Sequence, residues 1–260
     1  MNNGSVTCFG TGDGWPSAER NHSSYLYRLG GAGLLIDCGE SIDRSYKASG
    51  LGYEAFDTIL LSHLHADHFG GFFMLMQGCW LERRRKPLPV YLPRRAIPVL
   101  RAMLHSAFIF DELLPFRFAL LPLQNGGAFR VKNVRVRVFR TSHLDGYRAK
   151  FGTRYRVDYN SYAFTLEAGD TRVGHSADLG TPEDLEPLLA KPLDLLVCEL
   201  AHFSPEALFA YLRGRRIGQV VFVHLTRALR ANLPALRRLA ARSLGGLPHT
   251  FARDGQELAF

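Results

Sequence analysis

Residues 62–71 read SHLHADHFGG and concentrate metal-binding side chains in one short segment. His63, His65, Asp67 and His68 follow directly after the apolar run 58–61, which reads as the end of a buried strand. Imidazole nitrogens and carboxylate oxygens are ligands for zinc and similar divalent ions. Burying four such groups without partners would cost several kcal/mol. The segment therefore predicts a metal site at the end of a strand.

Further candidate ligands lie after later strands. His143 follows the run 134–142, Asp178 follows the run 172–176, and His224 ends the apolar run 220–223. Each of these alone reads equally well as an ordinary polar strand end. Together with the first cluster they give seven ligands, enough for two metals about 3.5–4 Å apart. The carboxylate of Asp178 could bridge the two ions, and open coordination positions would hold a hydroxide as nucleophile.

The elements that must position these residues alternate along the chain. Helices are expected at residues 71–84, 94–104, 182–189, 205–213 and 233–243. Strands are expected at residues 5–9, 25–29, 33–36, 57–61, 88–92, 117–121, 134–140, 162–166, 172–174, 193–198 and 219–223. The alternation predicts a layered α/β architecture, with residues 1–260 forming one domain.

The overall composition suits a folded protein with a basic surface. Hydrophobic residues make up 47% of the chain, the net charge is +8, and no run of about 18 apolar residues could cross a membrane. The charge would attract phosphate-bearing partners, or it is simply a solvated surface. The run 82–86 reads as an exposed, basic helix end. Four separated cysteines and the lack of a secretory signal favour free thiols and a cytoplasmic location.

Several motifs resemble the metallo-β-lactamase superfamily, in particular its RNase Z branch and the small phosphodiesterases related to it. Gly10-Thr11-Gly12 and Pro16-x-x-x-Arg20-Asn21-x-Ser23-Ser24 are similar to the opening of that branch. The segment 35–40, LIDCGE, is similar to the strand that follows, and 62–68 to the main metal motif. The resemblance extends from about residue 5 to 230 through 87–93 and 223–226. It implies a four-layer αβ/βα sandwich with a dinuclear site at one edge.

The resemblance also implies a role for each residue. One metal would be held by His63, His65 and His143, and the other by Asp67, His68 and His224, with Asp178 between them. Asp67 would also be the general base, and Asp37 would be hydrogen-bonded beside the ligands. Glu199 would position His202, which could donate a proton to the leaving oxygen. Alternatively, His202 could cap or pack against the helix that follows it.

Some positions depart from the family pattern. Cys198 stands where the family usually has histidine, Ala177 where it has glycine, and Leu179 where it has threonine. RNase Z-type enzymes carry a long arm for transfer RNA between the positions of His143 and Asp178. Here residues 144–177 leave no room for such an arm, which favours a compact phosphodiesterase.

Residues 144–159, LDGYRAKFGTRYRVDY, mix basic and aromatic side chains directly after His143. Arg148, Lys150 and Arg154 could bind phosphates while neighbouring aromatic rings stack on bases. Alternatively, the segment is a polar hairpin with its aromatic rings packed beneath it.

We therefore expect a hydrolase with two divalent metal ions that cleaves a phosphodiester in a small nucleotide or a single-stranded nucleic acid. Zinc is expected first, and manganese is compatible with the same ligands. A homodimer is compatible with the resemblance, since dimers are common among these relatives. One alternative is an RNase Z that lacks the usual arm, and another is a carboxylic ester or lactone hydrolase. A third is a nucleic-acid-binding protein without catalysis, which the retention of all seven ligands disfavours.

Overall fold

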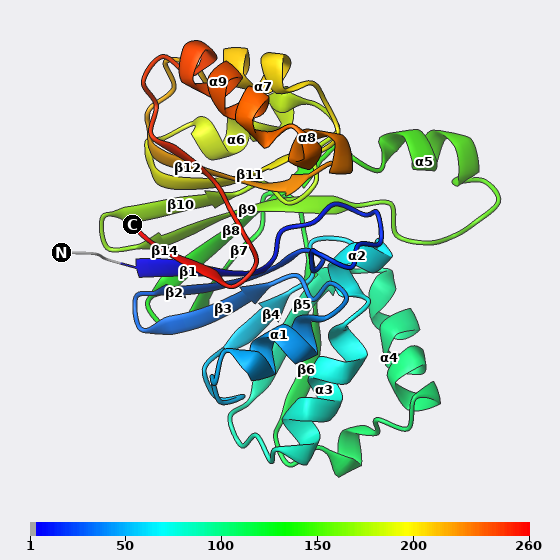
Figure 1. Cartoon of the computed structure of the whole chain (residues 1–260). Coiled ribbons are helices and arrows are strands. Elements are labelled where there is room, and N and C mark those ends of the chain that lie inside the picture. Colours follow the sequence, from blue (N-terminus) through cyan, green and yellow to red (C-terminus); the bar gives the residue numbers. More distant parts are fainter. Residues whose placement is uncertain (1–3) are drawn as a thin grey trace.

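A computed structural model describes residues 4–260 and contains two facing seven-stranded sheets (Figure 1). In spatial order the first sheet holds β14 (Gln256–Ala259), β1 (Gly4–Gly10), β2 (Ser24–Leu29), β3 (Ala32–Ile36), β4 (Thr58–Leu60), β5 (Leu88–Pro93) and β6 (Phe118–Leu123). The second holds β13 (His249–Phe251), β12 (Ile217–Leu225), β11 (Leu193–Leu200), β10 (Thr171–His175), β9 (Ser161–Ala168), β8 (Val134–Thr141) and β7 (Ala128–Val131).

Helices cover the outer face of each sheet. The first sheet is covered by α1 (Ile42–Ala48), α3 (Phe72–Leu81) and α4 (Ala96–Ser106), and the short α2 (Ala66–Phe69) lies near its edge. The second is covered by α6 (Glu186–Leu189), α7 (Pro205–Leu212), α8 (Arg227–Ala231) and α9 (Leu233–Ser243). Two 3₁₀ turns, Asp111–Leu113 and Pro182–Leu185, complete the helical segments, and α5 (Asp145–Phe151) projects from the body (Figure 1).

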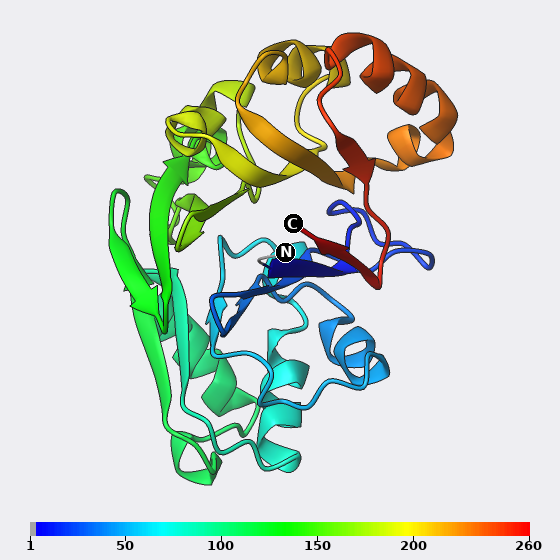
Figure 2. The ribbon, with the colours of Figure 1, turned by 90° about the vertical axis from the view of Figure 1, so that its left-hand side faces the viewer.

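Three apolar clusters follow from this layering. One fills the space between the sheets with residues such as Tyr27, Leu34, Val136 and Phe164. The other two lie between each sheet and its helices. Figure 2 shows the two sheets with helices outside each, and the last strand crossing back to pair with β1. The predicted four-layer αβ/βα sandwich is therefore confirmed.

All eleven expected strands are present, with each end within two residues of its expected position. The sequence patterns did not predict β7, β13 and β14 or the helices α1, α2, α5 and α8, all of which have seven residues or fewer. Segments of that length carry too few residues to display a clear hydrophobic period.

One expectation about the basic run 82–86 is wrong. Arg84 is 1% exposed, and its guanidinium donates to the backbone carbonyls of Tyr53, Phe56 and Pro87 while its Nε donates to the carbonyl of Lys86. These bonds satisfy a charge that would otherwise be costly to bury. Arg84 therefore has a structural role, in which it connects backbone segments 53–56 and 86–87 by hydrogen bonds. Arg83 and Arg85, by contrast, are exposed.

Two smaller expectations about the chain concern membranes and thiols. Among residues 4–260, no helix is both long and apolar enough to cross a bilayer. Cys8, Cys38, Cys79 and Cys198 are all buried free thiols.

Candidate metal centre

The seven predicted ligands converge at one edge of the sandwich, between the two sheets. The first sheet supplies His63, His65, Asp67 and His68 from the segment that leaves β4 and enters α2. The second sheet supplies three residues: His143 after β8, Asp178 after β10 and His224 within β12. The strands β8, β10 and β12 run in the same direction, so these residues meet at the same edge.

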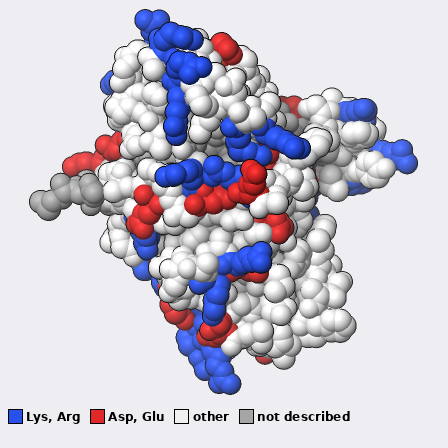
Figure 3. Space-filling model, in the orientation of Figure 1, with Lys and Arg blue, Asp and Glu red and all other residues white. Residues whose placement is uncertain are grey.

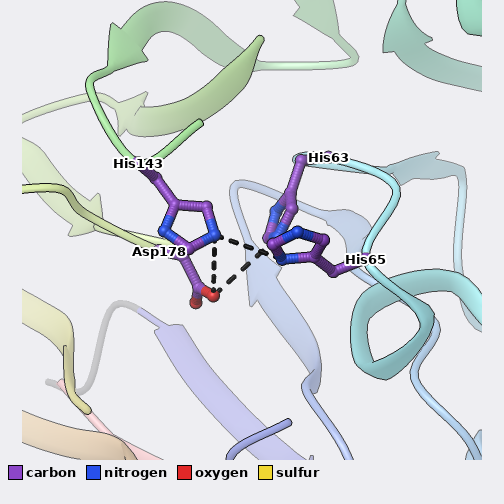
Figure 4. Close-up of side chains that lie close together, drawn as sticks. All are labelled: His63, His65, His143 and Asp178. Carbon is purple, nitrogen blue, oxygen red and sulfur yellow. Dashed lines mark hydrogen bonds and ion pairs between the residues drawn. The ribbon is translucent and has the colours of Figure 1, made fainter. Parts of the chain in front are cut away.

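Their ligand atoms fall into two groups, within each of which all atoms lie within 4.8 Å of one another. The first group is His63, His65, His143 and Asp178, whose side chains point toward one another in Figure 4. His143 Nε2 lies 3.2 Å from His65 Nδ1 and 3.6 Å from Asp178 Oδ2, and His63 Nε2 lies 3.8 Å from Asp178 Oδ2.

The second group is Asp67, His68, Asp178 and His224. His68 Nε2 lies 3.5 Å from Asp67 Oδ2 and 3.3 Å from Asp178 Oδ1. His224 Nε2 lies 3.7 Å from Asp67 Oδ2 and 3.5 Å from Asp178 Oδ2. Asp178 belongs to both groups, which is the division that the family resemblance implies.

Asp37 fixes the orientation of the first-sheet ligands. Its buried carboxylate accepts from His68 Nδ1 at 2.7 Å and from the backbone N–H and hydroxyl of Ser62 at 2.7 and 2.8 Å. The Ser62 hydroxyl also lies 3.0 Å from His63 Nδ1. These bonds hold the opposite ring nitrogens, Nε2, toward the other ligands, as partners of metal-binding histidines do.

Two positioning serines were not among the sequence candidates. Ser62 is one, and the other is Ser23, whose hydroxyl lies 3.0 Å from His224 Nδ1. Ser23 is part of the Arg20-Asn21-x-Ser23-Ser24 motif, so the signal was present in the sequence as a resemblance without an assigned role.

Glu199 and His202 lie beside the ligands as expected. Glu199 is buried and accepts from the backbone N–H groups of Leu179 and Ala201 at 3.0 and 2.7 Å. His202 Nδ1 lies 2.8 Å from Glu199 Oε1, and its Nε2 lies 3.9 Å from Asp178 Oδ2. Burial alone would lower the pKa of His202, but the Glu199 hydrogen bond and the nearby carboxylates raise it to about 9. The side chain of His202 is one-third exposed.

Asp184 ties the His143 and Asp178 segments together. Its Oδ2 accepts from the backbone N–H and hydroxyl of Ser142 at 2.9 and 2.8 Å, and from Gly180 N–H at 2.8 Å. It lies in the 3₁₀ turn 182–185, which begins with the predicted Thr181-Pro182 start signal. One carboxylate thus fixes the residues next to two candidate ligands.

The electrostatics divide the imidazoles into two kinds. Burial lowers the pKa of His63 well below its ordinary value, and it lowers that of His143 to about 4, so both rings are neutral and can offer a lone pair. Burial opposes charging of His68 too, but Asp178 and Asp37 outweigh it and raise that pKa. Burial likewise acts to raise the pKa of Asp178, but the surrounding imidazoles lower it well below the ordinary range.

The donor set fits divalent cations. Within residues 4–260, the buried atoms His63 Nε2, His68 Nε2 and Asp178 Oδ1 have no hydrogen-bond partner. Buried polar atoms are rarely left unpaired, and here they point into a cluster of nitrogen and oxygen donors. Cations shared by the two groups would satisfy these atoms.

Comparison with known proteins assigns the family. The family model described as Anti-Pycsar protein Apyc1 matches residues 5–210. The chain belongs to this family. Its fold and sequence relatives also place it in the RNase Z-like branch of the metallo-β-lactamase superfamily, which confirms the predicted resemblance.

Two sequence relatives named Ribonuclease Z are similar to this Apyc1-family chain. The protein from Archaeoglobus fulgidus is 37% identical over 139 residues, 54% of this chain and 44% of its own, so the match spans less than half its length. The protein from Mycobacterium avium is 29% identical over 93% of both chains. Among solved structures, the metallo-β-lactamase fold protein YhfI from Bacillus subtilis aligns over the full length of both chains, with a TM-score of 0.77 and 19% identity.

One departure of this Apyc1-family chain from the RNase Z pattern has a structural consequence. Ala177 adopts a φ of 47°, a left-handed conformation that glycine adopts without strain. Asp37 and His224, two other residues at the centre, also have positive φ values of 61° and 53°. Strained backbone is typical of functional sites, because the surrounding structure must hold it in place.

Only the start of the basic segment 144–159, which follows His143, lies beside the metal centre. The segment forms α5 and a following loop that project from the body, so the polar hairpin alternative is wrong (Figure 1). Arg148, Lys150 and Arg154 are all exposed, and Arg148 also donates to the carbonyl of Tyr159 and to Asn160. Tyr147, one of the aromatic residues of this segment that were expected to stack on bases, is 52% exposed with its ring centroid 5.6 Å from that of His65.

Proposed function

We propose that the protein is a metal-dependent hydrolase that cleaves phosphodiester bonds in small nucleotides or single-stranded nucleic acids. The observation that carries the proposal is the pair of four-ligand groups sharing Asp178, with Glu199 and His202 beside them. Zinc is the expected ion, held by His63, His65 and His143 on one side and by Asp67, His68 and His224 on the other. Such ions would supply Lewis acidity and an activated water at neutral pH.

The chain's own residues would orient the substrate and move protons. Asp67, at the start of α2 and 12% exposed, is placed to accept a proton at Oδ2. His202 would donate the Nε2 proton to the leaving oxygen, while its Nδ1–H donates to Glu199. Tyr147 and the exposed Lys150 and Arg154 would contact the base and phosphates of the substrate.

The decisive experiment combines metal analysis with a diesterase assay. We expect the purified protein to contain close to two zinc ions per chain and to hydrolyse bis(p-nitrophenyl) phosphate, with no activity on a panel of lactones. Asp67→Ala should abolish hydrolysis, whereas Asp170→Ala, an exposed carboxylate in the β9–β10 turn, should leave it unchanged. A protein that binds no metal, or an Asp67→Ala variant with full activity, would overturn the proposal.

A second candidate is an RNase Z without the usual arm, supported by the two relatives of that name. It predicts endonucleolytic cleavage at the 3′ end of a transfer RNA precursor and no activity on small diesters. The short α5 segment favours the first proposal, because it offers a much smaller surface than a transfer RNA arm.

We also propose that the protein forms a homodimer through the exposed face of α3, α4 and the residues directly after α4. Met74, Leu81, Val99, Met103 and Phe108 are all exposed there, and Figure 3 shows few charged side chains over this face. Exposed apolar patches of this kind usually mark interfaces. Light scattering should give a dimer mass that Met103→Glu with Phe108→Glu reduces to that of a monomer. A monomeric wild-type protein would contradict this.

A further inference from the structure

The C-terminal part of the chain has an extreme charge asymmetry. Residues 207–253 contain no aspartate or glutamate. The same segment contains nine arginines, at positions 213, 215, 216, 227, 230, 237, 238, 242 and 253. It spans most of α7, the strands β12 and β13, and the helices α8 and α9.

The arginines of α9 face solvent in one stripe. The apolar side of this helix, with Leu236 and Ala240, packs into the core, whereas Arg237, Arg238 and Arg242 are exposed. Within the described part of the chain, none of these three guanidinium groups lies within 4.0 Å of a carboxylate, in contrast to Arg215 with Glu186. Figure 3 shows basic side chains running over α9 and a second group over α8.

The stripe continues to the metal centre through α8. This helix begins three residues after His224, and its exposed Arg227 also has no carboxylate partner within residues 4–260. Arg230 is fixed by its bond to the Leu225 carbonyl at 2.8 Å and by Asp13 at 3.4 Å. The unpaired charge therefore extends from α9 to the neighbourhood of a candidate ligand.

An aromatic side chain stands at this end of the stripe. Trp15 is 66% exposed and, with Arg20, Arg227 and Arg230, lines a hollow of about 490 Å³. The chain enters this hollow from the metal centre: Gly14, the residue before Trp15, lies so close to Asp67 that a Cβ at this position would be 3.2 Å from Asp67 Oδ2. An indole and guanidinium groups that line the same hollow combine a stacking surface for a base with donors for a phosphate.

We propose that the surface formed by Trp15, Arg227, Arg237, Arg238 and Arg242 binds single-stranded nucleic acid and leads it to the metal centre. The inference rests on the proposed hydrolase function, because it names the class of substrate. Phosphates lie along the arginines of α9 and α8, and a base stacks on Trp15. Side chains four residues apart on a helix are about 5–6 Å apart, so Arg238 and Arg242 can contact neighbouring phosphates.

The chemistry of the surface favours nucleic acid over an anionic membrane. A helix that binds a membrane surface presents large apolar side chains to the lipid. The large hydrophobic side chains of α9 face the core, and no exposed one occurs between residues 158 and 260. All nine cations of the segment are arginines, whose planar group matches phosphate oxygens in pairs.

The test measures binding separately from hydrolysis. A fluorescein-labelled phosphorothioate single strand of about 20 nucleotides, which resists cleavage, is titrated with the metal-loaded protein and followed by fluorescence anisotropy. The affinity should fall with salt, and a blunt duplex of the same length should bind at least about fivefold more weakly, because its bases cannot stack on Trp15.

Two triple variants that each remove three positive charges distinguish binding by this surface from a general effect of the net charge. The triple variant Arg237→Gln, Arg238→Gln, Arg242→Gln should bind about tenfold more weakly and lower the slope of log affinity against log salt by about 2. The matched triple Arg44→Gln, Arg83→Gln, Arg85→Gln changes exposed arginines over the first sheet, and its affinity should stay within about twofold of wild type.

Trp15→Ala should weaken single-strand binding about tenfold and should change duplex binding little. Melting temperatures check that each variant is folded.

The inference fails if the wild-type protein does not bind the single strand, or if both triple variants lose affinity equally. It also fails if phosphatidylserine vesicles bind more tightly than the oligonucleotide and compete with it. Hydrolysis of bis(p-nitrophenyl) phosphate by the wild-type protein is measured in parallel. A protein that hydrolyses this diester and does not bind the strand would therefore refute the surface while leaving the hydrolase proposal in place.

Discussion

His202 is fixed by its neighbours in a geometry that suits proton donation. Glu199 accepts from the Nδ1 side of the ring, and the Nε2 atom faces the cluster 3.9 Å from Asp178. A carboxylate behind an imidazole sets the tautomer and stabilises the charged form. The alternative expectation, that His202 caps the helix after it, is not supported, because Ser204 supplies that cap.

The role of His202 can be tested through the leaving group. We expect His202→Gln to lower kcat by about 10²–10³ for diesters with an alkoxide leaving group, which needs a proton. The loss should be much smaller for bis(p-nitrophenyl) phosphate, because p-nitrophenolate leaves without one. His105→Gln, at an exposed histidine of α4, is the matched control and should change neither rate. Equal losses for both substrates would indicate a structural role for His202.

Asp184 shows how a residue outside the ligand set can determine metal binding. It accepts hydrogen bonds from the backbone N–H of Ser142, which precedes His143, and of Gly180, two residues after Asp178. We expect Asp184→Ala to weaken zinc affinity about 10- to 100-fold, as loss of partners behind the ligands does. Competition with a chromogenic chelator measures this. Glu183→Ala, at an exposed neighbour in the same turn, should retain wild-type affinity, and a similar loss there would refute the assignment.

At the scale of elements, the inner strands and the edge strand β6 were predictable, whereas the edge strands β7, β13 and β14 were not. β4, β11 and β12 contain short apolar runs, such as 195–198 and 220–223, because their central residues are buried on both faces of the sheet. By contrast, β7, β13 and β14 are short strands at sheet edges or pair over only three or four residues. Their positions are determined by pairing with strands distant in sequence, such as β14 with β1, which a local pattern does not encode.

The site was predictable for a different reason. Five of the seven candidate ligands are histidines, of which the chain has only ten, and strands running in one direction bring their ends to one edge of a sheet. Ser62, Ser23 and Asp184 could not be identified in this way, because serine and aspartate are common at turns. Only the hydrogen bonds of the folded chain distinguish these three residues from ordinary turn residues.

Asp57 connects several elements through one carboxylate. It precedes β4 and accepts from Lys86 before β5 at 2.6 Å, from Lys132 between β7 and β8 at 3.0 Å, and from Gly33 N–H in β3 at 2.7 Å. Burial acts to raise the pKa of Asp57, but these donors outweigh it and lower the pKa below its ordinary value. The carboxylate therefore links segments of the first sheet, at β3, β4 and β5, to the β7–β8 turn of the second sheet.

This link predicts a pH-dependent stability. A lowered folded-state pKa contributes stability that is present above the ordinary value of about 3.9 and is lost as pH falls through the folded-state pKa. We expect Asp57→Asn to lower the free energy of unfolding by about 1–3 kcal/mol at pH 7, and this difference should shrink below about pH 4. Urea unfolding at both pH values measures it. The exposed Asp170→Asn should show little change, and a pH-independent loss at Asp57 would contradict the reasoning.

At the scale of the whole molecule, the candidate metal centre joins the two halves of the sandwich. Four ligands come from the first sheet and three from the second, and each four-residue group contains residues from both. Away from this edge, the halves are held by the apolar cluster between the sheets and by the return of β14 to β1. Bound cations would thus stabilise the association of the two sheets as well as the local site.

Removal of metal should therefore lower the stability of the whole fold. Ions at about 100 times their dissociation constant contribute about 2.7 kcal/mol each, because they bind the folded chain only. For a protein of this size, each kcal/mol corresponds to about 2–4 °C in Tm. We expect chelation of the two ions to lower Tm by about 10–20 °C and zinc to restore it. In Asp178→Ala, which removes the candidate ligand common to both groups, chelation should lower Tm much less.

Hydrogen exchange of the backbone amides should become faster in residues 62–68 and around His143 and His224 when the metal is removed by chelation. Faster exchange in the segment from one sheet alone would show that the ions do not join the two halves.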